Sequence, residues 1–166
     1  PSAQPAHRPF SEAFPTPSGR FEFVSDRAEA DGHGRLPNYR PAAEASSRPR
    51  DDSLALIAAA SDHHVNSVFA GTEHTRSRTS RPPLTLHPDD AACRSLNAGE
   101  PVVVENHRGS FEAVLEVSDR TQPGVALTTK GWWRQGLNNT VPETDSDMAR
   151  GAVFHDNRVA VAALGT

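Results

Sequence analysis

Apolar and polar residues follow different patterns in the two parts of the chain, and the change falls near residue 53. Residues 54–60 form an unbroken apolar run, which is typical of a strand buried on both faces. Residues 110–117 alternate, with Phe111 and Leu115 on one face and Glu112 on the other, which is the clearest strand pattern present. Shorter patterns predict further strands at 84–86, 101–105, 125–129 and 158–162.

Turns and one short helix separate these strands. Pro88 and Asp90 indicate the first turn of the helix, where a proline N–H is not needed and an acidic side chain meets the positive end of the helix dipole. Cys93 is expected on the buried side of this helix as a structural residue. The sequence at 106–109 predicts a hairpin turn with Gly109 in the left-handed region.

The first 52 residues have no apolar pattern that could form a core. Prolines recur among alanine, serine, glycine and arginine, which is typical of a flexible extension or linker. Only 20–25 (RFEFVS) alternates in a way that predicts a short strand. Residues 53–166 then carry six or so short strands, one short helix and no helical crossovers. This order predicts a mainly β fold, a small closed or nearly closed barrel.

Composition narrows the function. The 166 residues carry a formal charge of −4, which argues against nucleic acid as the main partner because phosphate binding needs a concentrated basic face. A single cysteine excludes an internal disulfide and a cysteine-built metal site within this chain. No apolar run approaches the roughly 18 residues of a membrane span, and no signal peptide is visible. The start at Pro1 without methionine predicts a piece of a longer polypeptide.

Several short motifs occur in a fixed order along nearly the whole chain. They are TPSGRFEF at 16–23, HHVNS at 63–67, HPDDAA at 87–92, a turn, Val-rich strand and hairpin at 96–109, DR through PGV at 119–125, and WW, GLN, TD and FHD at 132–133, 136–138, 144–145 and 154–156. Each motif is weak alone. In this order they resemble the C-terminal domain of molybdopterin oxidoreductases of the DMSO-reductase superfamily.

The resemblance implies a double-psi β-barrel with one or two short helices. In that family the domain covers one half of a bis-molybdopterin guanine dinucleotide (bis-MGD) that carries molybdenum or tungsten, and the metal's protein ligand lies elsewhere in the enzyme. The isolated chain is therefore not expected to be catalytic or to hold the cofactor tightly. Its expected partners are the other domains of the parent enzyme, in the cytoplasm rather than exported. The motifs are most similar to those of the formate dehydrogenase and thiosulfate or polysulfide reductase branches.

The candidate cofactor contacts come from four places in the chain. The loop after the first predicted strand suits a dinucleotide, because polar side chains and backbone amides follow a strand end there. Relatives often carry an arginine just after this strand, where this chain has Ala59, Ala60, Ser61 and Asp62, so that contact is in doubt. The resemblance adds a carboxylate in the helix, three residues of the long loop and a histidine near its end. The candidates are Ser61, His63, His64, Asn66, Ser67, Asp90, Trp132, Trp133, Asn138 and His155.

Several of these residues also have purely structural interpretations. Asn66 could cap a turn, and Asp90 could serve only the helix N-terminus instead of guanine. Trp132 and Trp133 could pack in the core as well as against the pterin. The adjacent histidines His63 and His64 lack a spacing that favours zinc, and no metal site is expected.

A different class of function is a stand-alone double-psi barrel, used as a small subunit or a protein-interaction module. Decarboxylases with this barrel need a Gly-Ser cleavage site, and the pair Gly109-Ser110 lies in an ordinary hairpin turn. The motif at 16–23, which resembles part of a preceding domain, also favours the larger oxidoreductase.

Overall fold

The computed structural model divides the chain into two compact units, 1–40 and 41–166. The expected barrel domain began at residue 53, so the second unit includes about a dozen residues that the sequence assigned to the extension. The structure describes residues 11, 13–46, 52–62, 65–69, 71–77, 81–146 and 150–165.

The described part of the first unit contains one short helix, α1 (Asp26–Ala30). Its N-cap Ser25 accepts a hydrogen bond from the Ala28 N–H, and Arg35 pairs with Asp26 at 2.6 Å. The strand predicted at 20–25 is not formed, and that prediction was wrong. Its alternating residues have no partner strand, and Phe23 is 79% exposed. Alternation alone does not make a strand where the backbone has no ladder to join.

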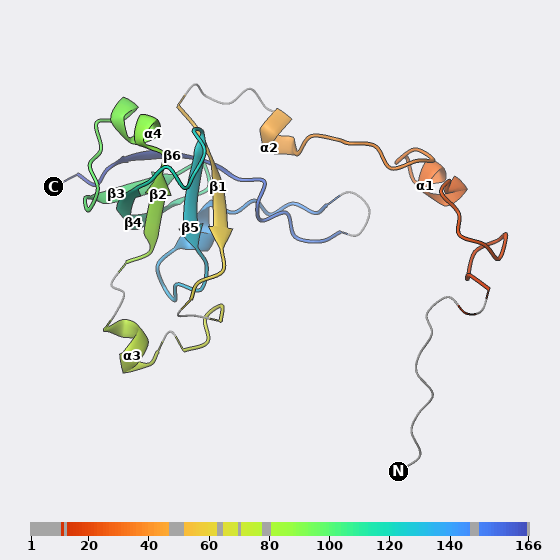
Figure 1. Cartoon of the computed structure of the whole chain (residues 1–166), viewed down its shortest axis with the longest axis horizontal. Helices are drawn as coiled ribbons and strands as arrows, with labels where there is room; N and C mark the ends of the chain where they lie inside the picture. Colours follow the sequence, from red (N-terminus) through yellow and green to blue (C-terminus); the bar gives the residue numbers. More distant parts are fainter. Residues whose placement is uncertain are drawn as a thin grey trace, which may run out of the picture. The chain divides into compact units, whose positions relative to one another are not determined.

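The second unit is a closed barrel of six strands in the order β1-β5-β2-β4-β3-β6 (Figure 1). The predicted strands are all present, within one residue at each end. Their bounds are β1 (Leu54–Ala59), β2 (Pro83–Leu86), β3 (Pro101–Glu105), β4 (Ser110–Val117), β5 (Val125–Thr129) and β6 (Arg158–Ala163).

Two parallel pairs define the topology. β1 runs parallel to β5 and β2 runs parallel to β4, while the other neighbours are antiparallel. Because β2 lies between β5 and β4, the two crossover connections interlock. This arrangement is the double-psi β-barrel, and the expected fold is confirmed.

Alternate residues of every strand fill the barrel. On β2 and β3 the inward side chains are completely buried, and on β4 Phe111, Ala113 and Leu115 point inward as the alternation predicted. Burying a side chain of this size is worth about 1.5–3 kcal/mol, so the closed interior is the main source of stability. The fully buried residues on β2 and β3 are Leu84, Leu86, Val102 and Val104.

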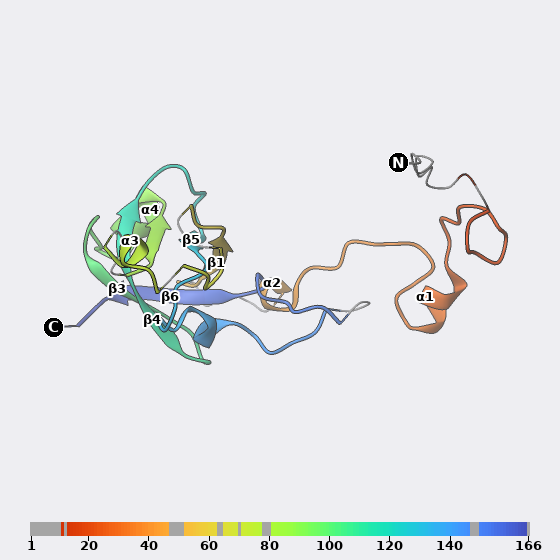
Figure 2. The same cartoon turned by 90° about the horizontal axis from the view of Figure 1, so that it is seen from below.

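In the described part of the second unit, one short helix precedes β1, and three lie between strands of the barrel in the chain. They are α2 (Ala43–Ser46), α3 (Glu73–Arg76), α4 (Pro88–Cys93) and the 3₁₀ helix η1 (Leu137–Thr140). η1 contacts β4 (Figure 2). α4 forms where Pro88 predicted it, but Cys93 is exposed and its expected burial was wrong, because Ala91 is the α4 residue that faces the core. No helix in the described ranges is long and apolar enough to cross a membrane.

The β3–β4 hairpin turn forms, but Gly109 does not adopt the predicted left-handed conformation. The reason for glycine is a close contact instead. A Cβ on Gly109 would lie 2.9 Å from the Cβ of Asn139, the third residue of η1. The missing side chain therefore lets η1 approach the hairpin.

Candidate functional site

Two loops converge where the parallel strands β1 and β5 end. The register pairs Ala59 with Thr129, the last residues of the two strands. Lys130 continues the ladder by donating its N–H to the carbonyl of Ala59 at 2.9 Å. Because parallel strands end at the same edge, the described residues that follow them, 60–62 and 65–69 after β1 and 130–136 after β5, start from one end of the barrel.

These segments enclose a pocket of about 460 Å³. It contains two cations and two indole rings, and none of its lining residues is acidic. Trp132 is half-buried and donates its Nε1–H to Oγ1 of Thr129 at 2.9 Å, whereas Trp133 is 61% exposed. The lining residues are Asn66, Ser67, Lys130, Gly131, Trp132, Trp133, Arg134, Gly136, Leu137 and Asn138.

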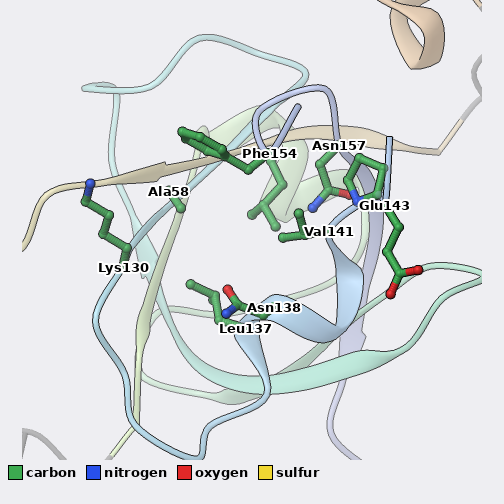
Figure 3. Close-up of a pocket in the computed structure, with 10 residues that line it drawn as sticks. Ala58, Lys130, Leu137, Asn138, Val141, Glu143, Phe154 and Asn157 are labelled. Carbon is green, nitrogen blue, oxygen red and sulfur yellow. The ribbon is translucent and has the colours of Figure 1, made fainter. Parts of the chain in front are cut away.

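A second pocket, of about 430 Å³, shares Lys130, Leu137 and Asn138 with the first. Figure 3 shows Phe154 and Ala58 on one side and Leu137 and Asn138 on the other. The amine of Lys130 and the carboxylate of Glu143 lie at opposite ends (Figure 3). Leu56, Val141, Pro142 and Asn157 complete the lining. The three shared residues show that the two pockets adjoin each other.

η1 presents Asn138 to both pockets. The helix begins after Gly136, whose φ of 74° is a left-handed conformation that glycine adopts without strain. A Cβ at Gly136 would lie 2.9 Å from the Asn139 amide nitrogen, so Asn139 is wedged between Gly109 and Gly136. Its amide donates to the Ser110 carbonyl at 3.3 Å. The side chain of Asn138 makes no hydrogen bond to the described residues, which leaves both its donor and its acceptor available.

A buried polar network holds the C-terminal end of η1. Thr140 is fully buried, and its hydroxyl accepts from the Asn157 amide at 3.1 Å. The Thr140 carbonyl accepts from the Asn106 amide at 2.8 Å and from Arg108 Nη1 at 3.1 Å. Asn106 also donates to Oδ1 of Asn157 at 3.0 Å. Satisfied buried networks of this kind fix geometry, because a misplaced partner leaves a buried polar group unpaired.

The structure brings five of the candidate residues together. Asn66 and Ser67 are the central residues of a tight turn closed by the Val68 N–H on the Val65 carbonyl at 3.0 Å. Asn66 adopts a φ of 53°, which asparagine tolerates, and so has a turn role while its side chain lines the pocket. Trp132, Trp133 and Asn138 line the same pocket, and neither tryptophan belongs to the buried core.

The other candidates lie elsewhere. Asp90 is at the opposite end of the barrel, where β1 and β5 begin, and its carboxylate accepts from the Gly124 N–H at 2.7 Å. His155 is exposed and lines a neighbouring hollow that shares Phe154 and Asn157 with the second pocket. Ser61 is half-buried beyond β1 and lines neither pocket. His63 and His64 lie outside the described residues.

Sequence reasoning missed the two cations of the site. Lys130, the single lysine of the chain, and Arg134 were not among the candidate residues. Their spacing gave a signal, because they flank the tryptophan pair within five residues of a long loop. Within the described ranges, no cluster of three or more histidine, cysteine or acidic side chains could hold a metal ion. With two cations, two indole rings and no acidic lining residue, the first pocket is suited to an anionic ligand with a planar group.

The family comparison agrees with this geometry. The family described as "Molydopterin dinucleotide binding domain" matches residues 54–158. The match includes β1 to β5, the first residue of β6 and every lining residue of both pockets. The chain belongs to this family.

Curated relatives place the domain within larger proteins. "Probable oxidoreductase YoaE" of Bacillus subtilis (strain 168) is 30% identical over 158 residues, covering 92% of this chain and 22% of the relative. A "Dimethyl sulfoxide/trimethylamine N-oxide reductase" of Rhodobacter capsulatus is 28% identical over 135 residues, covering 78% of this chain and 16% of the reductase. The chain thus spans about a fifth of these relatives. Neither is named a formate dehydrogenase, and likeness to that branch stays a prediction.

A solved structure supports the fold. The acetylene hydratase of Pelobacter acetylenicus superposes with a TM-score of 0.73 at 20% identity. The superposition covers 90% of this chain and 24% of the hydratase. At this identity the likeness shows the fold of the dinucleotide-binding domain, and the chemistry has to be argued from the site.

Proposed function

We propose that this domain binds one molybdopterin guanine dinucleotide of a bis-MGD cofactor, as the C-terminal domain of a larger molybdenum or tungsten oxidoreductase. The observation that carries the proposal is the gathering of Lys130, Arg134, Trp133 and Asn138 around one pocket at the end of a dinucleotide-binding barrel. The remaining domains of that enzyme are its proposed partners.

The residues present fit such a ligand. A dinucleotide carries a pyrophosphate, for which Lys130 and Arg134 supply positive charge that no acidic lining residue of the first pocket offsets. The exposed ring of Trp133 offers a flat apolar face to a base or a pterin. The amide of Asn138 can donate to and accept from the polar edge of such a ring.

The domain's contribution is binding and orientation. When bound, the metal-carrying cofactor supplies the redox chemistry, and the protein supplies affinity, alignment and electrostatics. No residue of the chain is assigned a catalytic role. The isolated chain is proposed to bind the nucleotide part weakly and to catalyse nothing alone, because it spans only about a fifth of its relatives.

A titration with guanosine diphosphate (GDP), with adenosine diphosphate (ADP) as the comparison, tests the proposal. Amide resonances of an isotope-labelled chain should shift at 65–67 and 130–138, and less with ADP than with GDP. Shifts of the Asp90 resonance would support the prediction that Asp90 contacts guanine. Equal shifts with both nucleotides would limit the site to a general anion pocket, and no shift at millimolar GDP would count against nucleotide binding by this domain alone.

The alternative function is a stand-alone double-psi barrel that acts as a small subunit or interaction module. The exposed apolar side chains beside the pockets favour a covering partner of some kind: Val65, Val68 and Phe69 are each more than half exposed. Purification from the native source distinguishes the two functions. A stable 17.9 kDa species would support the module, whereas recovery only within a longer polypeptide supports the oxidoreductase.

A further inference from the structure

The carboxylate of Glu44, in α2, contacts two separate parts of the barrel. One oxygen contacts the guanidinium of Arg108 in the β3–β4 hairpin, and the other accepts from the Arg158 N–H at 2.7 Å. The Glu44 N–H donates to the Asp156 carboxylate at 3.0 Å. The side chains of Glu44 and Arg108 are only 18% and 21% exposed, so solvent screens this pair less than an ordinary surface pair.

Arg108 connects Glu44 to η1. While Nη2 of Arg108 meets Glu44, its Nη1 donates to the carbonyl of Thr140, the last residue of η1. Arg158, the other partner of Glu44, follows Asn157, which donates to the Thr140 hydroxyl. Both oxygens of the Glu44 carboxylate are therefore linked to the C-terminal end of η1, one through Arg108 and the other through Arg158 and its neighbour Asn157.

η1 is too short to be held in place by its own backbone hydrogen bonds. It is four residues long, and its N-terminal end is fixed by the contacts of Asn139 with Gly109 and Gly136. The direction of Asn138 depends on both ends, because a single turn cannot propagate order by itself. Loss of the C-terminal anchor would let Leu137 and Asn138 rotate away from the pockets that they line.

We propose that Glu44 is a positioning residue of the pocket: through Arg108 it holds the C-terminal end of η1 and with it the orientation of Asn138. Glu44 precedes the residues that match the family, 54–158, so a segment before the barrel helps to shape the site. The inference rests on the proposed function only for the identity of the ligand.

The charge and the length of Glu44 both serve this role. Glutamine keeps the shape, but it has one acceptor oxygen for two partners and would turn an N–H₂ group toward a donor. The Glu44→Gln variant should therefore weaken the anchor without removing bulk. The matched control is Glu112→Gln, because Glu112 also pairs with an arginine, Arg81 at 3.1 Å, but in an exposed pair.

Hydrogen exchange without ligand gives the first readout, on the full 166-residue chain. The amides of Asn139 and Val141 close the turn by donating to the carbonyls of Gly136 and Asn138 at 2.8 and 3.1 Å. In Glu44→Gln their exchange should accelerate roughly tenfold relative to amides of β3 and β4, as local opening becomes easier. Glu112→Gln should leave it unchanged.

A double-mutant cycle separates the proposed chain of contacts from a general loss of stability. If Glu44 acts through Arg108, then Glu44→Gln added to Arg108→Ala should accelerate exchange at Val141 by clearly less than Glu44→Gln does in the unmodified chain, with only the contribution of the Arg158 contact remaining. If Glu44→Gln does not fold, Arg108→Lys replaces it, because lysine keeps the charge for Glu44 but lacks the second arm that reaches Thr140. It should produce the same acceleration at Asn139 and Val141.

The second readout is GDP affinity, which Glu44→Gln should lower several-fold although Glu44 lines neither pocket. Unchanged exchange at Asn139 and Val141 in a folded variant would overturn the inference. Faster exchange with unchanged GDP affinity would also overturn it, since the turn would then not position the binding group. Absence of GDP binding by the unmodified chain would count against the proposed function alone, because exchange is measured without ligand.

Discussion

Lys130 is the cation that the two pockets share. It is the only lysine of the chain, it lines both pockets, and its backbone continues the ladder between β1 and β5. The hydrogen bond from the Lys130 N–H to Ala59 fixes the position of the Lys130 backbone, while the exposed ammonium group stays hydrated. A hydrated cation at a rigid strand end attracts an anion at modest cost, because little has to be desolvated or ordered.

Replacing Lys130 with glutamine should weaken GDP binding and flatten its dependence on salt. An exposed charge contact of this kind is worth about 1 kcal/mol or less, which corresponds to a few-fold change in Kd. Titrations at two ionic strengths measure both quantities. Arg120→Gln is the control, since Arg120 is exposed in the turn between β4 and β5 at the other end of the barrel. An equal loss of affinity in both variants would mean that only net charge matters.

Glu100 gives a residue-scale prediction that concerns pH. The side-chain amide of Asn97 donates to the carboxylate at 2.9 Å and the Asn97 N–H at 3.0 Å, and these bonds lower the pKa of Glu100 below its usual value. A lowered folded-state pKa means that this turn stabilises the fold above the ordinary glutamate pKa of about 4.3, and that the contribution is lost as the pH falls through the folded-state pKa.

An NMR titration of the Glu100 carboxyl carbon checks this prediction. Asn97→Ala should raise the pKa of Glu100 part of the way back, because the side-chain bond is lost and the backbone bond remains. A Glu100 pKa that is the same with and without the Asn97 amide would show that the turn does not form in solution.

At the scale of elements, η1 contributes residues to both pockets at the end of the barrel. Its one turn fits against the hairpin only because Gly109 has no side chain, and it starts only because Gly136 takes a left-handed conformation. The strands of the barrel give the site a rigid support, and η1 adds the side-chain amide of Asn138, which can still form hydrogen bonds. Binding groups held on a rigid support in this way lose little entropy when a ligand arrives.

Gly109→Ala should therefore impair binding through η1. The new Cβ would meet Asn139 at 2.9–3.0 Å, including its backbone oxygen, so the helix has to shift. We expect a loss of roughly 1–3 kcal/mol in the free energy of unfolding, as for other overpacked sites, together with weaker GDP binding. Gly165→Ala is the control, since nothing lies within 4 Å of its Cβ position and its backbone is unstrained. Equal stability of the two variants would contradict the close contact.

The sequence predicted the strands well and the site only in part. Strands such as β4 are dictated by alternation that any half-buried strand must satisfy, so local pattern was sufficient. The strand at 20–25 failed because strand formation needs a partner, which local pattern cannot supply. The Glu44–Arg108–Thr140 contacts join residues 32 to 64 positions apart, and no spacing rule predicts them. Asn138, a candidate from the resemblance, lines the pocket, whereas Glu44 and Lys130 were not among the candidates.

At the scale of the whole molecule, stability comes from the closed interior and binding from one end of it. Core residues such as Leu86 are completely buried, whereas the pocket residues Lys130, Trp133 and Asn138 are exposed. The two sets share few residues, Leu56 and Leu137 among them. Stability and binding should therefore respond to different substitutions.

Leu86→Ala tests this separation. Removing a fully buried leucine leaves a cavity and should cost about 2–5 kcal/mol in the free energy of unfolding, while GDP affinity of the folded fraction stays the same. Ile57→Ala, on β1 with Ile57 40% exposed, should cost much less. Urea denaturation followed by far-ultraviolet circular dichroism measures both. A large loss of affinity in folded Leu86→Ala would show that the site and the core are coupled.

The position of the two tryptophans has a spectroscopic consequence. They are the only tryptophans of the chain, they are adjacent, and both line the first pocket rather than the barrel interior. Indole emission therefore reports on the environment of the site and not on the core. Emission can change when the 130–136 segment opens while the barrel still gives its β signal, so local loosening and global unfolding can be observed separately in one unlabelled sample.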